Sequence, residues 1–165
     1  RSDRDWSSDV CSSDLDSIQK NDTLVYKTKV GRTVYGGGGI MPDIFIPRDT
    51  TEYTEYFAKV VNYAHLYQFA FAYTDQHRDK LSKNKDWKAM ENYLDQQNLL
   101  AAFTSYAATK GVKPDPKQIQ LSRNIILTRL KAFISRNILG DEGFYPILFK
   151  NDPAVLRAIS ELNKK

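Results

Sequence analysis

The chain has 165 residues and a formal net charge of +4, with 24 Lys and Arg against 20 Asp and Glu. Its basic residues are scattered rather than clustered, so a solvated surface is favoured over a nucleic-acid interface, and no nucleic-acid partner is expected. Asn62, His65 and Gln68 interrupt the longest uncharged stretch, so no transmembrane segment is expected either.

The first residues do not resemble a selected protein sequence. Asp5 to Leu15, DWSSDVCSSDL, match the translation of a common sequencing adapter, so residues 1–15 are expected to be an artefactual, disordered leader. A natural Ser/Asp-rich leader would be equally unstructured. The leader holds the single cysteine, Cys11, and leaves a charge of +6 on the other residues. No disulfide or cysteine-ligated metal is therefore expected there, and the native chain is expected to start near Asp16, inside a gene.

Residues 16–50 contain the strand signals of the chain. After a polar loop, Leu24 to Val30 alternate as a half-buried strand, Val30-Gly31 forms a hairpin corner, and Arg32 to Tyr35 return as a second strand. Gly36 to Gly39 form an open loop, and Ile44 to Ile46 read as a short third strand closed by Pro47. A sheet of two or three such strands is marginal alone, so it is expected to be the edge of a larger core.

Residues 51–165 change to helical periodicity. The first helix is expected over about Thr51–Lys80, with Phe57, Val60, Val61, Ala64, Tyr67 and Phe71 in its core stripe. The second is expected from Asp86 to about Thr109, ended by Lys110-Gly111, with Trp87, Met90, Leu94, Leu100, Phe103 and Tyr106 in the core.

The third helix is expected to start at the Asp115-Pro116 cap and to end at Gly140. Its predicted core residues are Ile119, Ile126, Leu127, Leu130, Phe133 and Ile134. Glu142 to Lys150 contain Pro146 and are expected to be irregular or briefly helical. Asp152-Pro153 then starts a short helix marked by Leu156, Ile159 and Leu162. The predicted class is α+β, mostly α, with a small sheet followed by about four helices.

No catalytic or metal-binding arrangement is visible in the residues. The Gly36–Gly39 run lacks the Lys-Ser/Thr and the following helix of a phosphate loop. His65 and His77 would lie about 120° apart on one helix and cannot share a metal without a third element. No Ser-His-Asp set suggests itself, and no motif singles out a Ser-Lys pair. Catalytic residues, metal ligands and cofactors are therefore all predicted to be absent.

The stretch GRTVYGGGGIMPDIFIP resembles a segment of the carboxy-terminal processing, or tail-specific, serine protease family in its Bacteroidetes-like form. In that family a similar motif closes the catalytic core and a helical extension follows. The matching positions are Gly31, Arg32, Val34, Tyr35, Gly37, Gly38, Gly39, Ile40, Pro42 and Asp43. The resemblance extends over about Asp16–Lys165, and it is specific in the motif and weaker over the helices.

The resemblance implies peptide-bond hydrolysis by a Ser/Lys dyad, in which a lysine of depressed pKa takes the serine proton. In the family, the dyad and the PDZ domain that admits protein or peptide substrates lie upstream of the motif, so no catalytic residue is carried over to this chain. The implied compartment is the periplasm or cell envelope. Residues 16–50 would be the edge of the protease core and 51–165 a helical extension, and this fragment is expected to be inactive. The alternative is a non-catalytic helical module that binds a protein partner.

Overall fold

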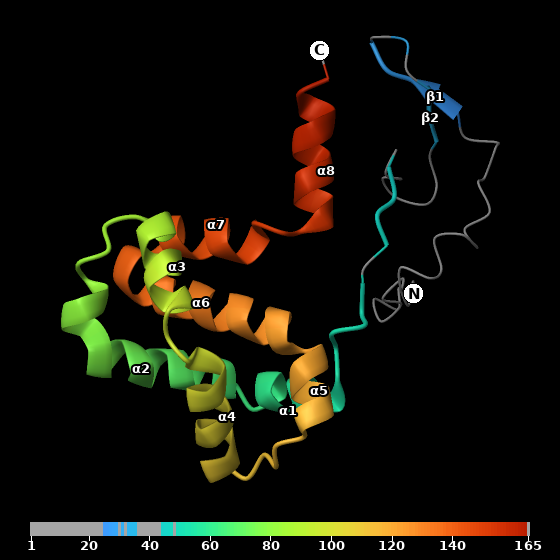
Figure 1. The fold of residues 1–165 in the computed structure, drawn as a ribbon. Helices are drawn as coiled ribbons and strands as arrows, with labels where there is room; N and C mark the ends of the chain where they lie inside the picture. Colours follow the sequence, from blue (N-terminus) through green and yellow to red (C-terminus); the bar gives the residue numbers. More distant parts are fainter. Residues whose placement is uncertain (1–24, 30, 32, 36–43, 48, 165) are drawn as a thin grey trace, which may run out of the picture. The chain divides into compact units, whose positions relative to one another are not determined.

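The structure is a computed structural model that describes residues 25–29, 31, 33–35, 44–47 and 49–164. The chain divides into two units, one ending at residue 48 and the other spanning Asp49–Lys165, and each is described by itself. The described residues are mostly helical with a small antiparallel sheet (Figure 1), which confirms the expected α+β, mostly α class.

The first unit contains a short hairpin. Strands β1 (Val25–Lys27) and β2 (Thr33–Tyr35) pair antiparallel, with Val25 opposite Tyr35 and Lys27 opposite Thr33. The predicted corner is confirmed at Gly31, which has a φ of 81° and donates its N–H to the Thr28 carbonyl at 2.9 Å. A residue with a side chain is disfavoured at this φ, which explains the glycine. The expected third strand is wrong, because residues 44–47 are described without any strand pairing.

The second unit contains eight helices in its described residues, twice the number expected. Four of them begin at a residue whose side chain accepts hydrogen bonds from N–H groups of the first turn: Thr54, Asp86, Asp115 and Asp152. Their bounds are α1 Glu55–Asn62, α2 His65–Leu81, α3 Trp87–Asp95, α4 Leu99–Thr109, α5 Pro116–Leu121, α6 Arg123–Leu139, α7 Asp141–Phe149 and α8 Pro153–Leu162.

Three expected long helices are each broken into two. The first breaks at Ala64, which takes a left-handed φ of 55° between α1 and α2. The second breaks between α3 and α4 over residues 96–98, and the third breaks at Ser122 between α5 and α6. No glycine or proline stands at any of these points, so the usual sequence signals of a helix end are missing.

Helix α7 forms although Pro146 lies within it, so the segment expected to be irregular or briefly helical is a helix of nine residues. Proline removes one backbone donor. That loss is offset by the burial of Gly143 and Ile147 on the face of α7 that packs along α6. The final helix is confirmed as α8, and Asp152 caps it by accepting from the N–H groups of Ala154 and Val155.

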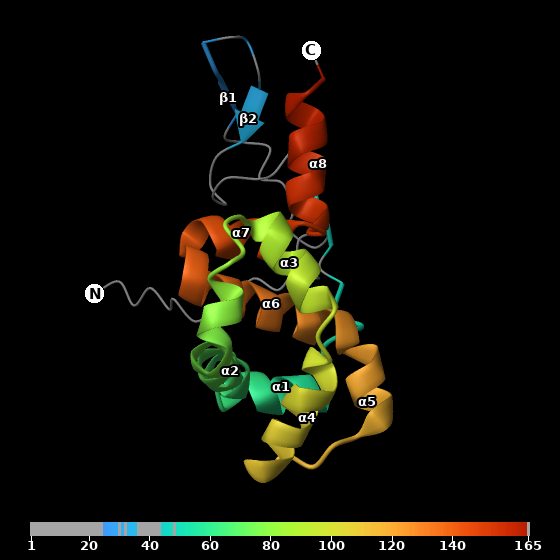
Figure 2. The same cartoon turned by 60° about the vertical axis from the view of Figure 1, so that its left-hand side comes forward.

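Helix α6 is the centre of the second unit. Figures 1 and 2 show α2, α3, α4 and α7 arranged around it, in agreement with the contacts between these elements. Its side chains Ile126, Leu130 and Ile134 are fully buried, as predicted. They share one cluster with residues from the surrounding helices, among them Phe57, Val60, Phe69, Met90, Leu94, Leu99 and Phe103.

The predicted core stripe of the first helix is wrong beyond Val61. Ala64 is exposed, and Tyr67 and Phe71 are each 51% exposed, whereas Phe69 and Tyr73 are buried. The break at Ala64 changes the helix direction, so the periodicity of α1 cannot be continued into α2. Leu156, Ile159 and Leu162 are likewise exposed on α8.

Candidate functional site

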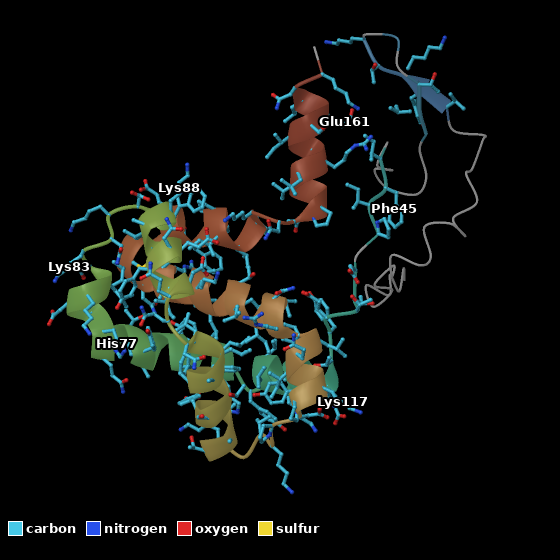
Figure 3. The ribbon with its side chains drawn as sticks, viewed as in Figure 1. Phe45, His77, Lys83, Lys88, Lys117 and Glu161 are labelled. Atoms are coloured by element: carbon cyan, nitrogen blue, oxygen red, sulfur yellow. The ribbon has the colours of Figure 1, made fainter. Side chains whose placement is uncertain are left out.

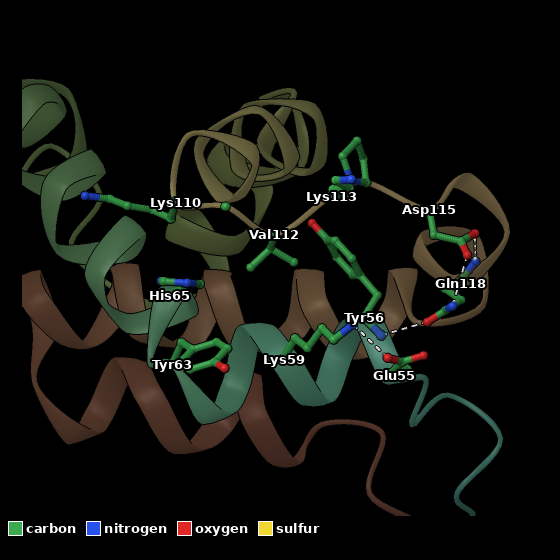
Figure 4. A pocket seen from close by; sticks show the side chains of 12 residues that line it. Glu55, Tyr56, Lys59, Tyr63, His65, Lys110, Val112, Lys113, Asp115 and Gln118 are labelled. Atoms are coloured by element: carbon green, nitrogen blue, oxygen red, sulfur yellow. Dashed lines mark hydrogen bonds and ion pairs between the residues drawn. The ribbon is translucent and has the colours of Figure 1, made fainter.

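A cleft of about 730 Å³ opens in the second unit between α1, the α1–α2 junction and the connection from α4 to α5 (Figure 4). Glu55, Tyr56 and Lys59 line it from α1, and Tyr63 and His65 line it from the junction. The opposite wall is formed by residues 110–115 and Gln118.

The loop wall is held by a helix cap at each end. At the end of α4, Gly111 has a φ of 88° and donates to the Ala108 carbonyl, while Val112 donates to the Ala107 carbonyl, both at 3.0 Å. This pair of bonds is the Schellman arrangement, and it confirms the predicted stop at Lys110-Gly111. The loop therefore leaves α4 in a fixed direction.

At the other end of the loop, Asp115 accepts hydrogen bonds from the N–H groups of Lys117 and Gln118 at 3.0 and 3.1 Å, and Pro116 takes the first helical position. The predicted cap is confirmed here as well. Gln118 in turn joins the two walls, because its Oε1 accepts the N–H of Tyr56 at 2.7 Å.

The α1 wall depends on the break at Ala64. The Ala64 N–H donates to the Val61 carbonyl at 2.9 Å and closes a tight turn, after which His65 begins α2. His65 is 9% exposed, and its ring lies 5.8 Å from that of Tyr63 and 6.5 Å from that of Tyr106. Without the break, α1 and α2 would be one continuous helix, and helical geometry alone would set the position of His65 relative to Tyr56. The cleft would then not have this shape.

Positive charge is only partly compensated in the cleft. Lys59 pairs with Glu55 at 2.7 Å, and this hydrogen bond raises the pKa of the Lys59 ammonium. The Asp115 carboxylate is engaged in capping α5. Lys110 lies with its Nζ 5.5 Å from the centre of the Tyr106 ring, and within the described residues neither Lys110 nor Lys113 forms an ion pair with a carboxylate. Two lysines are therefore left to attract an anion.

Two residues that line the cleft each carry a polar atom that is buried and has no hydrogen-bond partner among the described residues. These atoms are the hydroxyl of Tyr56, a residue that is 3% exposed, and Nδ1 of His65. Burial raises the pKa of the Tyr56 phenol, which stays neutral and able to donate at neutral pH. Each unpartnered buried polar atom costs about 1–3 kcal/mol of stability. Such atoms are uncommon and call for a physical explanation.

In the described part of the chain, no serine Oγ is hydrogen-bonded to a lysine Nζ, and no three His, Cys, Asp or Glu side chains lie together as a metal site would need. His77 contacts the Tyr73 ring at 4.3 Å and lies on another turn of α2 than His65. The described helices include none with the length and hydropathy needed to cross a membrane.

The family-motif residues lie elsewhere. Gly31 is at the hairpin corner, and Val34 and Tyr35 belong to β2. Arg32, Gly37, Gly38, Gly39, Ile40, Pro42 and Asp43 lie outside the described residues. The cleft itself was not predicted from the sequence, although both caps of its loop were.

The fold therefore defines a helical unit with a basic, partly apolar cleft and an attached hairpin. The chain belongs to DUF8443, a family of unknown function, whose profile matches residues 56–140, just over half of its length. The matched range contains α2 to α6 and every cleft residue except Glu55. No curated protein and no solved structure matches the chain.

Proposed function

We propose that this chain is the C-terminal portion of a tail-specific processing serine protease, with the peptide-hydrolysing Ser/Lys dyad carried by a preceding core. The observation that carries the proposal is the GRTVYGGGGIMPD stretch, with a left-handed Gly31 at the corner of a real hairpin. That hairpin is also very small. Its Val25 and Tyr26 side chains are about half exposed, as expected for strands that pair with a larger sheet in the intact enzyme.

In this proposal the helical unit is a non-catalytic part of a periplasmic or envelope enzyme. Support comes from the cleft, which offers lysine and aromatic side chains to the surface of another protein. The unit would contact the protein substrate or the protease core, and hydrolysis would take place in the preceding domains.

The test is the reading frame upstream of the codon for Asp16, followed by labelling of the encoded protein with a serine-directed phosphonate. The expected result is an open frame with serine and lysine motifs and a labelled protein, while the 165-residue chain alone stays unlabelled. A frame without such motifs would contradict the proposal. Labelling of the 165-residue chain, if a point substitution within that chain abolishes it, would also contradict the proposal.

A second candidate is a stand-alone helical module that binds a protein partner. Exposed aromatic side chains at Tyr63, Tyr67 and Phe71 favour it, because aromatic residues are enriched at protein interfaces. Panning of random displayed peptides on the intact chain should then enrich one sequence pattern, and Tyr67→Ser or Phe71→Ser should abolish its binding. The absence of any enriched pattern would count against the module.

A further inference from the structure

We propose that α8 pairs with the α8 of a second copy of this chain, in an antiparallel contact centred on Ile159. The contact extends at each end onto the Tyr145 and Phe149 rings of α7. The inference goes beyond the proposed protease parentage and does not depend on it.

The first argument is that α8 has an apolar face without a partner in the described structure. Figures 1 and 2 show α8 extending away from the helices around α6, none of its side chains is buried, and no other described element packs extensively along it. Leu156 and Ile159 are 50% and 51% exposed, and Leu162 is 80% exposed. A helix with a distinct apolar face normally buries that face against another element.

The second argument is the symmetry of this face. Leu156 and Leu162 lie three residues before and three residues after Ile159, so their side chains project about 60° to either side of it. In an antiparallel pair with a two-fold axis beside Ile159, Leu156 of one copy and Leu162 of the other lie at the same height, on opposite sides of the contact. The face is therefore complementary to itself, as a two-fold interface requires.

The third argument is the position of the charges on α8. Arg157 and Glu161 each lie two residues from Ile159, about 160° around the helix, and so face away from the contact. On this outer face, where Figure 3 labels Glu161, Arg157 and Lys164 both pair with the Glu161 carboxylate, at 2.8 and 2.7 Å. Two copies can therefore meet without repulsion between like charges. The compensated cations also disfavour an anionic membrane surface as the partner.

The fourth argument is the area of the contact. The Phe149 carbonyl accepts the Asp152 N–H at 3.1 Å, which places Phe149 at the start of α8, and the Tyr145 ring stacks on the Phe149 ring at 5.8 Å. Tyr145 and Phe149 are 48% and 39% exposed. An antiparallel pair brings the end of the second α8 beside this start, so the two rings join the contact.

The exposed apolar surface has the size that a stable pair needs. With about 200 Å² for a whole large side chain, the three aliphatic residues of α8 and the two rings of α7 expose roughly 500 Å². An interface that is about 65% apolar and contains this surface would bury about 800 Å² on each copy, which is the standard size of a specific interface.

The first test is sedimentation equilibrium of the full chain. A monomer–dimer equilibrium with a Kd of about 100 µM or tighter is expected, because interfaces of this size reach micromolar affinity or better. Ile159→Gln should weaken dimerisation about 10-fold or more, whereas Arg157→Gln on the outer face should leave it unchanged. Because α8 buries no side chain, both variants should keep the helical circular dichroism of the wild type.

Four results would overturn the proposal. They are a Kd weaker than about 100 µM, a dimer that Ile159→Gln does not weaken, equal weakening by Arg157→Gln, and a monomer that binds anionic vesicles through α8.

The second test is oxidative cross-linking in a Cys11→Ser background, which removes the single native thiol. Ile159→Cys should form a disulfide-linked dimer, because this residue faces its own copy, and Arg157→Cys should not. A mixture of Leu156→Cys and Leu162→Cys chains should cross-link faster than either chain alone. Cross-linking of Leu156→Cys chiefly with itself would indicate a parallel pair and would overturn the proposal, as would equal cross-linking of Arg157→Cys and Ile159→Cys.

Discussion

Gly143 is the position where the packing of α6 against α7 is most sensitive to a single methyl group. A Cβ added there would clash with Ser135 Oγ and would lie 2.8 Å from Leu139 Cβ and 3.0 Å from the Ser135 carbonyl oxygen. Ser135 Oγ can rotate away, but the other two atoms are fixed to the backbone of α6. Gly143→Ala therefore requires the two helices to move apart.

The expected size of the effect follows from two opposing terms. Alanine is favoured over glycine inside a helix by about 1 kcal/mol. Overpacking of a close interface costs about 1–3 kcal/mol, and carbon atoms at 2.8 Å are well inside their optimal separation of about 3.5–4.0 Å. Because two of the three close atoms are fixed to the α6 backbone, the packing cost is expected in the upper part of its range, about 2–3 kcal/mol, so Gly143→Ala should lower the free energy of unfolding by about 1–2 kcal/mol.

The assay is urea unfolding followed by helical circular dichroism, with linear extrapolation to water. Glu142→Ala, on the neighbouring exposed position of α7, is the control for helix propensity and should change stability by less than about 0.5 kcal/mol. Ser135→Ala removes the rotatable atom of the clash and should partly rescue Gly143→Ala in the double variant. If Gly143→Ala is as stable as the wild type or more stable, the close approach of α6 and α7 is refuted.

Three further predictions test the supports of the cleft and the core. Ser122→Ala removes the Oγ that donates to the Glu52 carbonyl at 2.6 Å and should lower the free energy of unfolding by about 1–3 kcal/mol in the same assay; an unchanged value would contradict this role. Burial raises the pKa of the Tyr56 phenol above its unfolded value of about 10. The stability that this shift contributes is fully present below the unfolded pKa and is lost as pH rises through the folded pKa. Tyr56→Phe should therefore lose less stability at alkaline pH than the wild type, as measured by urea unfolding at a series of pH values. Lys150→Ala breaks the 2.8 Å ion pair with Glu91. Because the lysine is half exposed, the free energy of unfolding should fall by less than about 1 kcal/mol, and only at low salt. A larger loss of stability, or one insensitive to salt, would contradict the assignment.

The features that could be predicted from the sequence are those whose cause is local. Asp86, Asp115 and Asp152 each accept hydrogen bonds from N–H groups two and three residues later, and the pattern of an aspartate before a helix, twice followed by proline, reveals this arrangement directly. Gly111 and Gly31 occupy the left-handed conformations for which glycine is suited. In each case the residues that stabilise the feature lie within a few positions of one another.

The helix breaks could not be predicted because no glycine or proline marks them. Ser122, where α5 ends and α6 begins, donates to the carbonyl of Glu52 and hydrogen-bonds with the hydroxyl of Thr54, about 70 residues earlier. Ala64 adopts a left-handed φ with no glycine or asparagine to indicate it, and the break it creates buries His65. At Ser122, tertiary hydrogen bonds override the local helix propensity.

The cleft combines these two situations. The loop wall of the cleft is fixed by two local caps, which could be predicted from the sequence. The position of this wall opposite Tyr56 depends instead on the Gln118 hydrogen bond to α1, across 62 residues, and on the break at Ala64. The family match covers residues 56–140 and so includes both walls, but it excludes the protease-like motif around Gly31. The cleft and the segment that resembles the protease family therefore lie in different parts of the chain.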